Sequence, residues 1–320
     1  MQSFLDLTSS DLKQVDALIL ENLNSNVALV EHIGEYLVQA GGKRLRPMLS
    51  LITAKALGFE GSSTFQLATA VEFIHTATLL HDDVVDESNL RRGRDTANAK
   101  WGNAPAVLVG DFVYSRAFQL LVKIGNLDVL DILSETTNVL AEGEVLQLVN
   151  AGDASLSERD YYQVIRAKTA KLFEAACEGA AILASASTEQ RQQLATFGDQ
   201  LGIAFQLVDD LLDYVGNVDT MGKNVGDDLA EGKTTLPLIH AMQHASAEDA
   251  GTIRTALQTK NTDQIDDIIR IVEATGSLNY TRDAAYRAIE TAKGALSTLP
   301  ASVYRSALEE IADYCIARTK

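Results

Sequence analysis

The chain has 320 residues, of which 46% are hydrophobic and 6% aromatic, and its 44 Asp and Glu outnumber 27 Lys and Arg to give a net charge of −17. A chain of this length can form one large domain or two ordinary ones around a sizeable hydrophobic core. The acidic excess argues against a nucleic-acid partner, which requires a basic face. A small anionic ligand would need local basic residues or bridging metal ions.

The cysteines and the N-terminal stretch bear on cellular location. Cys177 and Cys315 lie far apart in the sequence and form no C-x-x-C pair, as expected in a reducing compartment. The stretch "MQSFLDLTSSDLKQVD" has neither the basic segment nor the continuous apolar segment of a secretion signal. No stretch reaches the ~18 uncharged apolar residues of a membrane span. We therefore expect a soluble, cytoplasmic protein.

Helical hydrophobic spacing dominates the chain from end to end. Apolar residues recur three or four positions apart in the windows 15–23, 67–78, 107–118, 145–149, 201–208 and 308–316. Breaks rich in Gly, Asn and Ser separate the windows, for example "GFEGSS", "NLRRGRDTANAKWGN" and "NAGDASLS". Alternation with a period of two is scarce, and no linker or low-complexity tract divides the chain. The pattern predicts an all-α protein in which residues 1–320 form one domain, a large helical bundle.

An acidic cluster, "HDDVVDES" at residues 81–88, follows the mostly apolar stretch "TATLL". Asp82 and Asp86 are four residues apart, so on a helix they project from one face. One such pair is more often a solvated surface patch, but "DDLLD" repeats the pattern at 209–213 after a second apolar helix. Carboxylates gathered beside apolar surface are costly unless cations neutralise them. Mg²⁺ prefers oxygen ligands of this kind, and the repeat therefore favours a metal site.

Basic residues gather in four short segments of this acidic chain. They are Lys43, Arg44 and Arg46; Arg91, Arg92 and Arg94; Lys168, with Thr169 beside it; and Lys223 and Lys233. Three of the four segments flank turns that contain Gly, where backbone N–H groups can also bind an anion. Arg binds phosphate oxygens in pairs, and Lys adds a point charge. Each segment alone fits a solvated turn, but together with two metal motifs they indicate sites for more than one diphosphate.

Five ordered motifs carry a resemblance to a known family. They are "GGKRLRP" (41–47), "LLHDDVVDESNLRRG" (79–93), "LVGDF" (108–112), "AKTAKLF" (167–173), and "FQLVDDLLDYVGN" with "GKNVGDDLAEGKTTLPL". On these motifs the chain resembles the trans-isoprenyl diphosphate synthases over essentially its whole length. The details "AEGEVLQL" and "GKNVGDDLAEGK" look most like bacterial members that make octaprenyl chains. The resemblance implies an all-α bundle of the isoprenoid synthase type around a deep central cavity, assembled as a homodimer.

The resemblance also implies an activity, that of a Mg²⁺-dependent prenyltransferase. Such an enzyme adds isopentenyl diphosphate to an allylic diphosphate such as farnesyl diphosphate. Cations and basic side chains stabilise pyrophosphate as it leaves. The double bond of isopentenyl diphosphate then attacks the allylic carbocation, and a proton is lost. This chemistry needs positioning and charge rather than a nucleophilic side chain. We also expect transient membrane contact on product release.

The family's binding residues carry over to this chain position by position. Asp82 and Asp86 would bind Mg²⁺ at the allylic diphosphate and Asp209 a further Mg²⁺, with roughly two or three ions per active site. The allylic diphosphate would contact Arg91, Lys168, Thr169 and Gln206, with Lys223 and Lys233 as weaker assignments. Isopentenyl diphosphate would contact Lys43, Arg46, His75 and Arg92. Two departures from the family pattern, Asn217 and Trp101, leave the metal ligands untouched.

Small side chains before the first acidic motif bear on product length. Ala77 and Thr78 stand five and four residues before Asp82, one helical turn below the proposed metals. A growing chain anchored at Asp82 passes that turn, and bulky side chains there would stop growth early. The small pair predicts a long all-trans product, octaprenyl, for the side chain of ubiquinone or a related quinone. Heptaprenyl, solanesyl and geranylgeranyl products stay open. The deeper candidates for a tunnel floor are Ile74, Phe118, Leu120 and Leu121.

Three other classes of protein share part of these patterns. A di-iron bundle would use two E-x-x-H motifs. The sequence has one, formed by Glu72 and His75. A terpene cyclase would mix Asn, Ser or Thr, and Glu in its second motif, unlike "DDLLD". A non-catalytic subunit of a heteromeric synthase would lose aspartates from one motif, and both are intact here. His81 has no support from the family and is predicted to be structural.

Overall fold

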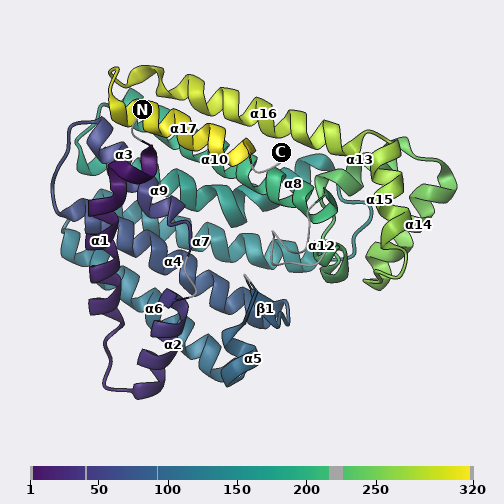
Figure 1. Cartoon of the computed structure of the whole chain (residues 1–320), viewed down its shortest axis with the longest axis horizontal. Helices are drawn as coiled ribbons and strands as arrows, with labels where there is room; N and C mark the ends of the chain where they lie inside the picture. Colours follow the sequence, from purple (N-terminus) through teal and green to yellow (C-terminus); the bar gives the residue numbers. More distant parts are fainter. Residues whose placement is uncertain (1–2, 40–41, 92, 216–225, 318–320) are drawn as a thin grey trace. The chain divides into compact units, whose positions relative to one another are not determined.

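The structure is a computed structural model that describes residues 3–39, 42–91, 93–215 and 226–317. Almost all of this part of the chain is helical (Figure 1). The elements up to residue 150 are α1 (Phe4–Leu23), α2 (Ala28–Gln39), α3 (Leu45–Ala56), α4 (Ser63–Val85), β1 (Leu90–Arg91), β2 (Arg94–Asp95), α5 (Ala97–Trp101), α6 (Asn103–Ile124) and α7 (Leu127–Asn150). Those that follow are α8 (Glu158–Ile165), the π-helix η1 (Arg166–Ala170), α9 (Lys171–Leu183), α10 (Thr188–Val215), α12 (Asp227–Glu231), α13 (Leu236–His244), α14 (Ala247–Thr259), α15 (Ile265–Ala274), α16 (Ser277–Ala295), the 3₁₀-helix η2 (Leu296–Thr298) and α17 (Val303–Ala317). The prediction of an all-α protein is confirmed. Among the helices described, none is both long and apolar enough to cross a bilayer.

A short hairpin lies where the sequence predicts only a break between helices. Strand β1 pairs antiparallel with β2, and Arg91 stands opposite Arg94. Helix α5 follows directly, begun by Thr96, whose hydroxyl accepts a hydrogen bond from the N–H of Ala99 at 3.3 Å. Strands of two residues are too short to show alternation, so the sequence pattern does not reveal them. The hairpin matters because it carries Arg91, one of the predicted diphosphate ligands.

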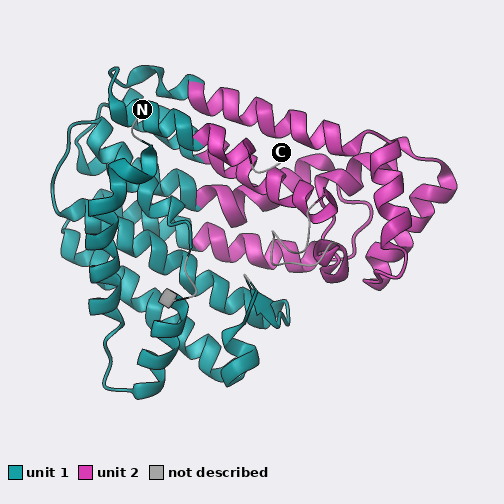
Figure 2. Cartoon of the chain, in the orientation of Figure 1, with its two compact units in different colours: residues 1–137, 172–198, 294–311 teal, residues 138–171, 199–293, 312–320 magenta. Residues whose placement is uncertain are grey.

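The chain divides into two compact units, coloured separately in Figure 2. Unit 1 comprises residues 1–137, 172–198 and 294–311, and unit 2 comprises residues 138–171, 199–293 and 312–320. Each unit is thus assembled from separate stretches of chain, and helices such as α7 and α10 contribute residues to both. The prediction that the whole chain forms one domain stays a prediction. The first acidic motif belongs to unit 1 and the second to unit 2.

Helix α4 is the central helix of unit 1, with α1, α3 and α6 packed against it. Every residue from 67 to 74 is buried, including Leu67, Val71 and Ile74 of the predicted apolar stripe. A helix that is buried on all sides belongs to a hydrophobic interior. The last turn of α4 carries Asp82, so the first acidic motif lies where this buried helix ends.

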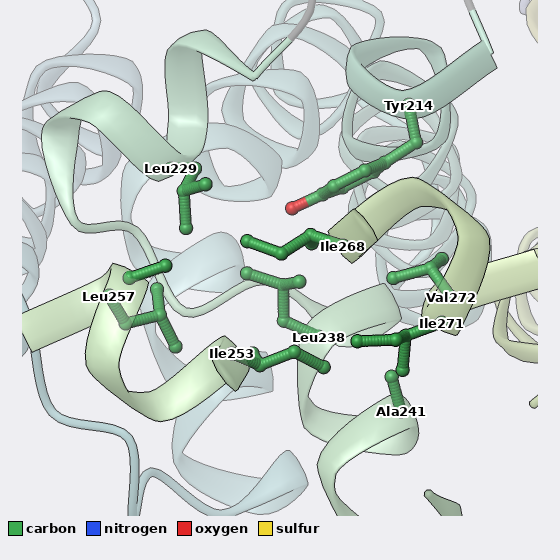
Figure 3. Close-up of a cluster of buried hydrophobic side chains, with 10 residues drawn as sticks. Tyr214, Leu229, Leu238, Ala241, Ile253, Leu257, Ile268, Ile271 and Val272 are labelled. Atoms are coloured by element: carbon green, nitrogen blue, oxygen red, sulfur yellow. The ribbon is translucent and has the colours of Figure 1, made fainter. Parts of the chain in front are cut away.

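Unit 2 has a hydrophobic core of its own, built from α12 to α15 and the end of α10 (Figure 3). Each of these helices supplies at least one buried side chain: Tyr214, Leu229, Leu238, Ile253 and Ile268. Burial of an aliphatic side chain of this size stabilises the fold by about 1.5–3 kcal/mol. Because Tyr214 directly follows the second acidic motif, this core anchors the helix end that carries the motif.

Candidate active site

The first acidic motif spans the C-terminal end of α4. Asp82 lies in the last turn, and Asp86 is the C-cap residue, whose N–H donates to the carbonyl oxygen of Asp82 at 2.8 Å. This bond keeps the helical i, i+4 spacing through the motif, as predicted. Both residues are partly exposed, so their carboxylates stay accessible to a cation.

The middle aspartate of this motif, Asp83, has a different environment. It is 4% exposed, and its Oδ1 accepts hydrogen bonds from Nε and Nη2 of Arg91, each at 2.7 Å. The amide of Asn98 donates to the main-chain oxygen of Asp83 at 3.0 Å. Asp83 therefore fixes Arg91 beside the motif. This role of Asp83 was not predicted, although Asp83 falls about 100° around the helix from Asp82 and so had to face another way.

Of the three basic residues of "GGKRLRP", Arg44 has a structural role. Arg44 caps α3 in a left-handed conformation (φ 48°), and its guanidinium pairs with Glu72 at 2.6 Å and with Asp16 at 3.4 Å. These contacts make Arg44 a structural residue and occupy Glu72 of the E-x-x-H pattern. Lys43 is exposed. Arg92, a further predicted ligand of isopentenyl diphosphate, lies outside the described residues.

Arg46 and His75, both predicted to contact isopentenyl diphosphate, lie next to each other in unit 1. Nη1 of Arg46 is 3.2 Å from Nε2 of His75. The guanidinium carbon of Arg46 is 4.4 Å from the centre of the Phe173 ring. Stacking uses the face of the guanidinium, whereas its N–H groups point along its plane. The Phe173 ring therefore orients the guanidinium of Arg46, whose N–H donors lie beside the imidazole of His75.

His81 has contacts that support the structural role predicted for it. Its Nε2 lies 3.2 Å from the carbonyl oxygen of Val107 and 3.4 Å from a carboxylate oxygen of Asp111, both on α6. A β-carbon at Gly110 would come within 2.3 Å of the same nitrogen. The glycine of "LVGDF" therefore makes room for this ring between α4 and α6.

The second acidic motif lies in the last turns of α10. Asp209 is partly exposed, whereas Asp210 and Asp213 are 2% and 5% exposed. Asp210 accepts hydrogen bonds from the Tyr161 hydroxyl at 2.5 Å and from Nε2 of Gln206 at 2.8 Å. Burial raises the pKa of Asp210 to about 7, and the nearby charges of Asp228 and Asp209 act in the same direction, while the two hydrogen bonds oppose them. The contact between Asp210 and Tyr161 was not predicted, since no sequence pattern links positions so far apart.

Two predicted ligands of the allylic diphosphate, Thr169 and Gln206, meet in unit 2. The Thr169 hydroxyl donates to Oε1 of Gln206 at 2.8 Å. Thr169 belongs to the π-helix η1, a rare conformation that often marks a functional site. A continuous network therefore runs from Thr169 through Gln206 and Asp210 to Tyr161.

Lys168, the neighbouring predicted ligand, is held by a carboxylate. Its Nζ lies 2.6 Å from Oε2 of Glu144, on α7. A β-carbon at Gly143 would lie 2.7 Å from the β-carbon of Ala167, so this glycine allows α7 to approach η1 closely. The close approach brings Glu144 within reach of Lys168, which the sequence alone does not indicate.

The residues singled out in the sequence that remain to be described are Lys223, Lys233, Asn217, Ala77 and Thr78. Lys233 forms an ion pair with Glu231, and Lys223 and Asn217 lie outside the described residues. Ala77 is fully buried, and Thr78 is partly buried with its hydroxyl donating to the carbonyl oxygen of His75 at 2.8 Å. A role for this pair in a tunnel stays a prediction.

The partly exposed carboxylates of the two acidic motifs are the kind of ligand that a hard divalent cation binds. Asp82 and Asp86 in unit 1 and Asp209 in unit 2 offer partly exposed oxygen donors, which Mg²⁺ prefers. Within the described ranges, no group of three or more His, Cys, Asp or Glu side chains is placed to hold a metal ion. The assignment of these three aspartates as ligands stays a prediction.

Comparison with known proteins identifies the family. The family model "Polyprenyl synthetase" matches residues 27–275. The chain is 49% identical to the octaprenyl diphosphate synthase of Escherichia coli (strain K12), over 100% of this chain and 99% of that protein. It is 51% identical to the octaprenyl diphosphate synthase of Haemophilus influenzae, over 98% and 95%. It is 48% identical to the all-trans-nonaprenyl-diphosphate synthase (geranyl-diphosphate specific) of Rhodobacter capsulatus, over 99% and 98%.

A solved structure has the same fold. The polyprenyl synthase from Caulobacter crescentus CB15, complexed with calcium and isoprenyl diphosphate, matches with a TM-score of 0.95 at 43% identity, covering 99% of this chain and 97% of that one. An all-helical chain with aspartate-rich motifs at the ends of two helices, matched over its length by these synthases, is of the prenyltransferase class. The chain belongs to the polyprenyl synthetase family. The resemblance found in the sequence is confirmed.

Proposed function

We propose that the protein is a Mg²⁺-dependent, all-trans polyprenyl diphosphate synthase that adds isopentenyl diphosphate to an allylic diphosphate such as farnesyl diphosphate. The observation that carries the proposal is that each unit holds an aspartate motif beside cationic or amide groups already fixed in place. In unit 1 this group is the guanidinium of Arg91, held by Asp83, and in unit 2 it is the amide of Gln206, held by Asp210. The Caulobacter relative, described with calcium and isoprenyl diphosphate, supports a divalent cation.

The residues present suit the parts of this reaction. Asp82, Asp86 and Asp209 would hold Mg²⁺, which supplies positive charge to the departing pyrophosphate. Arg91 and Lys168 would donate N–H groups to the allylic diphosphate, with charge-assisted hydrogen bonds that strengthen as negative charge develops. The acceptor's diphosphate would be held by Lys43, Arg46, His75 and Arg92.

We propose octaprenyl as the product, as a precursor of a quinone side chain. The two octaprenyl diphosphate synthases among the relatives match over nearly the full chain. The small residues Ala77 and Thr78, one turn before Asp82, suit a long product. A nonaprenyl product is the second candidate, because the Rhodobacter relative is almost equally similar.

We propose that the protein is a homodimer. Outward-facing apolar residues occur on α6 of unit 1, where Leu108 and Val122 are 67% and 63% exposed. Leu148 and Val149 on α7, in unit 2, are 62% and 74% exposed. Large apolar side chains left exposed on a helix favour a protein interface. Sedimentation of the wild type should give a dimer mass, and Leu108→Glu should shift it toward a monomer.

The activity is tested with purified protein, farnesyl diphosphate, labelled isopentenyl diphosphate and Mg²⁺. We expect an octaprenyl product by chain-length chromatography and none after chelation of the metal. A C45 product would replace octaprenyl by nonaprenyl. The absence of product from any allylic primer would favour the alternative that the protein is a non-catalytic subunit of a heteromeric synthase. A cytoplasmic location stays a prediction.

A further inference from the structure

Tyr161 is a buried residue that none of the predicted roles includes. It lies on α8, is 3% exposed, and donates its hydroxyl hydrogen to Oδ2 of Asp210 at 2.5 Å. Burial, followed by the charge of Asp210, raises the pKa of Tyr161 well above its usual value, so the hydroxyl keeps its hydrogen. Tyr161 is therefore a permanent donor to the carboxylate of Asp210.

The hydrogen bonds of Asp210 determine which way the amide of Gln206 faces. The two oxygens of Asp210 accept from Tyr161 and from Nε2 of Gln206. With Tyr161 on Oδ2 and Nε2 of Gln206 on Oδ1, both oxygens of Asp210 act as acceptors, so the NH₂ group of Gln206 faces Asp210. Its Oε1 then faces Thr169, whose hydroxyl donates to it at 2.8 Å.

Counting hydrogens separates the roles of Thr169 and Gln206. The hydroxyl of Thr169 has one hydrogen, which the bond to Gln206 uses. The NH₂ group of Gln206 has two, and in the described part of the chain this network uses one of them. A diphosphate is an acceptor and needs donors. Gln206 therefore has a hydrogen to offer, whereas Thr169 has to break its bond to Gln206 first.

We propose that Tyr161 is a positioning residue for the allylic diphosphate. Through Asp210 it fixes the amide of Gln206, which donates its second hydrogen to the diphosphate, and Thr169 supports the same amide from the other side. This inference rests on the proposed function and deepens it, because it assigns the direct contact to Gln206 and the supporting contacts to Tyr161 and Thr169.

The test is the variant Tyr161→Phe, which removes only the hydroxyl. We expect the KM for farnesyl diphosphate to rise about 3- to 10-fold, the effect of one lost hydrogen bond, with the KM for isopentenyl diphosphate unchanged. Calorimetry with farnesyl diphosphate and Mg²⁺, without the acceptor, should show the same loss of affinity. A purely structural role would change both KM values together.

The matched control is Tyr280→Phe. Tyr280 also donates to a carboxylate in unit 2, that of Glu158, at 2.9 and 3.0 Å, but it has no described contact with the network. This variant should leave both KM values unchanged.

A second variant keeps the inference testable if Tyr161→Phe does not fold. Thr169→Val should raise the KM for farnesyl diphosphate selectively, Thr169→Ser should restore it, and the double variant with Tyr161→Phe should show less than the product of the two effects. Unchanged or equally raised KM values in an active Tyr161→Phe enzyme would overturn the inference alone. An inactive wild type would instead overturn the proposed function.

Discussion

The two acidic motifs share the pattern D-D-x-x-D, but the structure treats their second aspartates differently. In unit 1, Asp83 is buried against the guanidinium of Arg91. In unit 2, Asp210 is buried against the neutral donors Tyr161 and Gln206. The first carboxylate is balanced by a cation. The second is not, and for this reason burial raises its pKa to about 7.

The difference shows how one short pattern can position two kinds of ligand. A carboxylate paired with Arg91 orients a cation that would bind a diphosphate by charge. A carboxylate among neutral donors orients the amide of Gln206, which would bind by a neutral hydrogen bond. In both motifs the first aspartate, Asp82 or Asp209, is partly exposed. The first aspartates, together with Asp86, are thus the candidates for metal binding, and the second ones hold predicted substrate ligands in place.

The largest expected effect concerns the three partly exposed aspartates of the two motifs. Asp82→Ala or Asp209→Ala should lower kcat by at least about 10²–10³-fold, the scale for loss of a preorganised electrostatic contact, without unfolding the protein. Asp86→Ala should do the same. The measurement is steady-state turnover in Mg²⁺ together with thermal melting. Near wild-type turnover in any of the three would remove that residue from the metal site.

A smaller effect should distinguish the residues assigned to the allylic substrate from those assigned to isopentenyl diphosphate. Lys168→Ala, in unit 2, should weaken farnesyl diphosphate by about one to two decades, since a charge-assisted contact contributes about 1.5–3 kcal/mol. Lys43→Ala or Arg92→Ala, in unit 1, should weaken isopentenyl diphosphate by a similar factor. Separate KM determinations for the two substrates check the assignment. Equal losses for both substrates in each variant would contradict it.

Product length should depend on only one of the two helices that carry the motifs. One turn before its motif, α4 has Ala77 and Thr78, whereas α10 has Ala204 and Phe205. If the growing chain runs along α4, Ala77→Tyr should shorten the product to about C15–C20. The tyrosine ring would block the path of the chain about one helical turn, or about 5.4 Å, below Asp82. Phe205→Ala should leave the length unchanged.

Thermal melting adds a control for Ala77→Tyr. Ala77 is fully buried, so a ring placed in a closed core would destabilise the protein by about 1–3 kcal/mol. A tunnel would accept the ring with little loss. A destabilised variant that still makes the wild-type length would show that no tunnel passes Ala77.

The smallest expected effect concerns stability. Asp83→Asn leaves the Arg91 cation facing a neutral amide and should lower the free energy of unfolding by about 1–3 kcal/mol, since Arg91 is partly exposed. Asp210→Asn removes a carboxylate that already lies among neutral donors, and should cost less than Asp83→Asn. Urea unfolding of both variants at one pH measures the difference. A larger loss of stability for Asp210→Asn than for Asp83→Asn would contradict the different charge environments assigned to the two carboxylates.

Much of the fold and part of the site could be predicted from the sequence, because they depend on local spacing. The period of three to four residues identifies α4 and α10, and the four-residue spacing of Asp82 and Asp86 survives in the structure. The pairs Arg46 with His75 and Thr169 with Gln206 were each assigned to a common ligand by resemblance, and the structure brings each pair into contact. Helical periodicity depends on residues that are close together in the sequence, so it can be recognised without knowledge of the fold.

Local patterns in the sequence are enough to predict that the chain is helical, that acidic motifs end two apolar helices, and that basic residues accompany them. The partner of each buried carboxylate depends instead on how the helices pack. Tyr161 and Asp210 are 49 positions apart and Lys168 and Glu144 are 24 apart, and no local pattern links them. The hairpin that carries Arg91 to Asp83 is likewise too short to leave a pattern. Such pairings depend on which helices pack together, because a buried charge takes whatever donor the packing brings within about 3 Å.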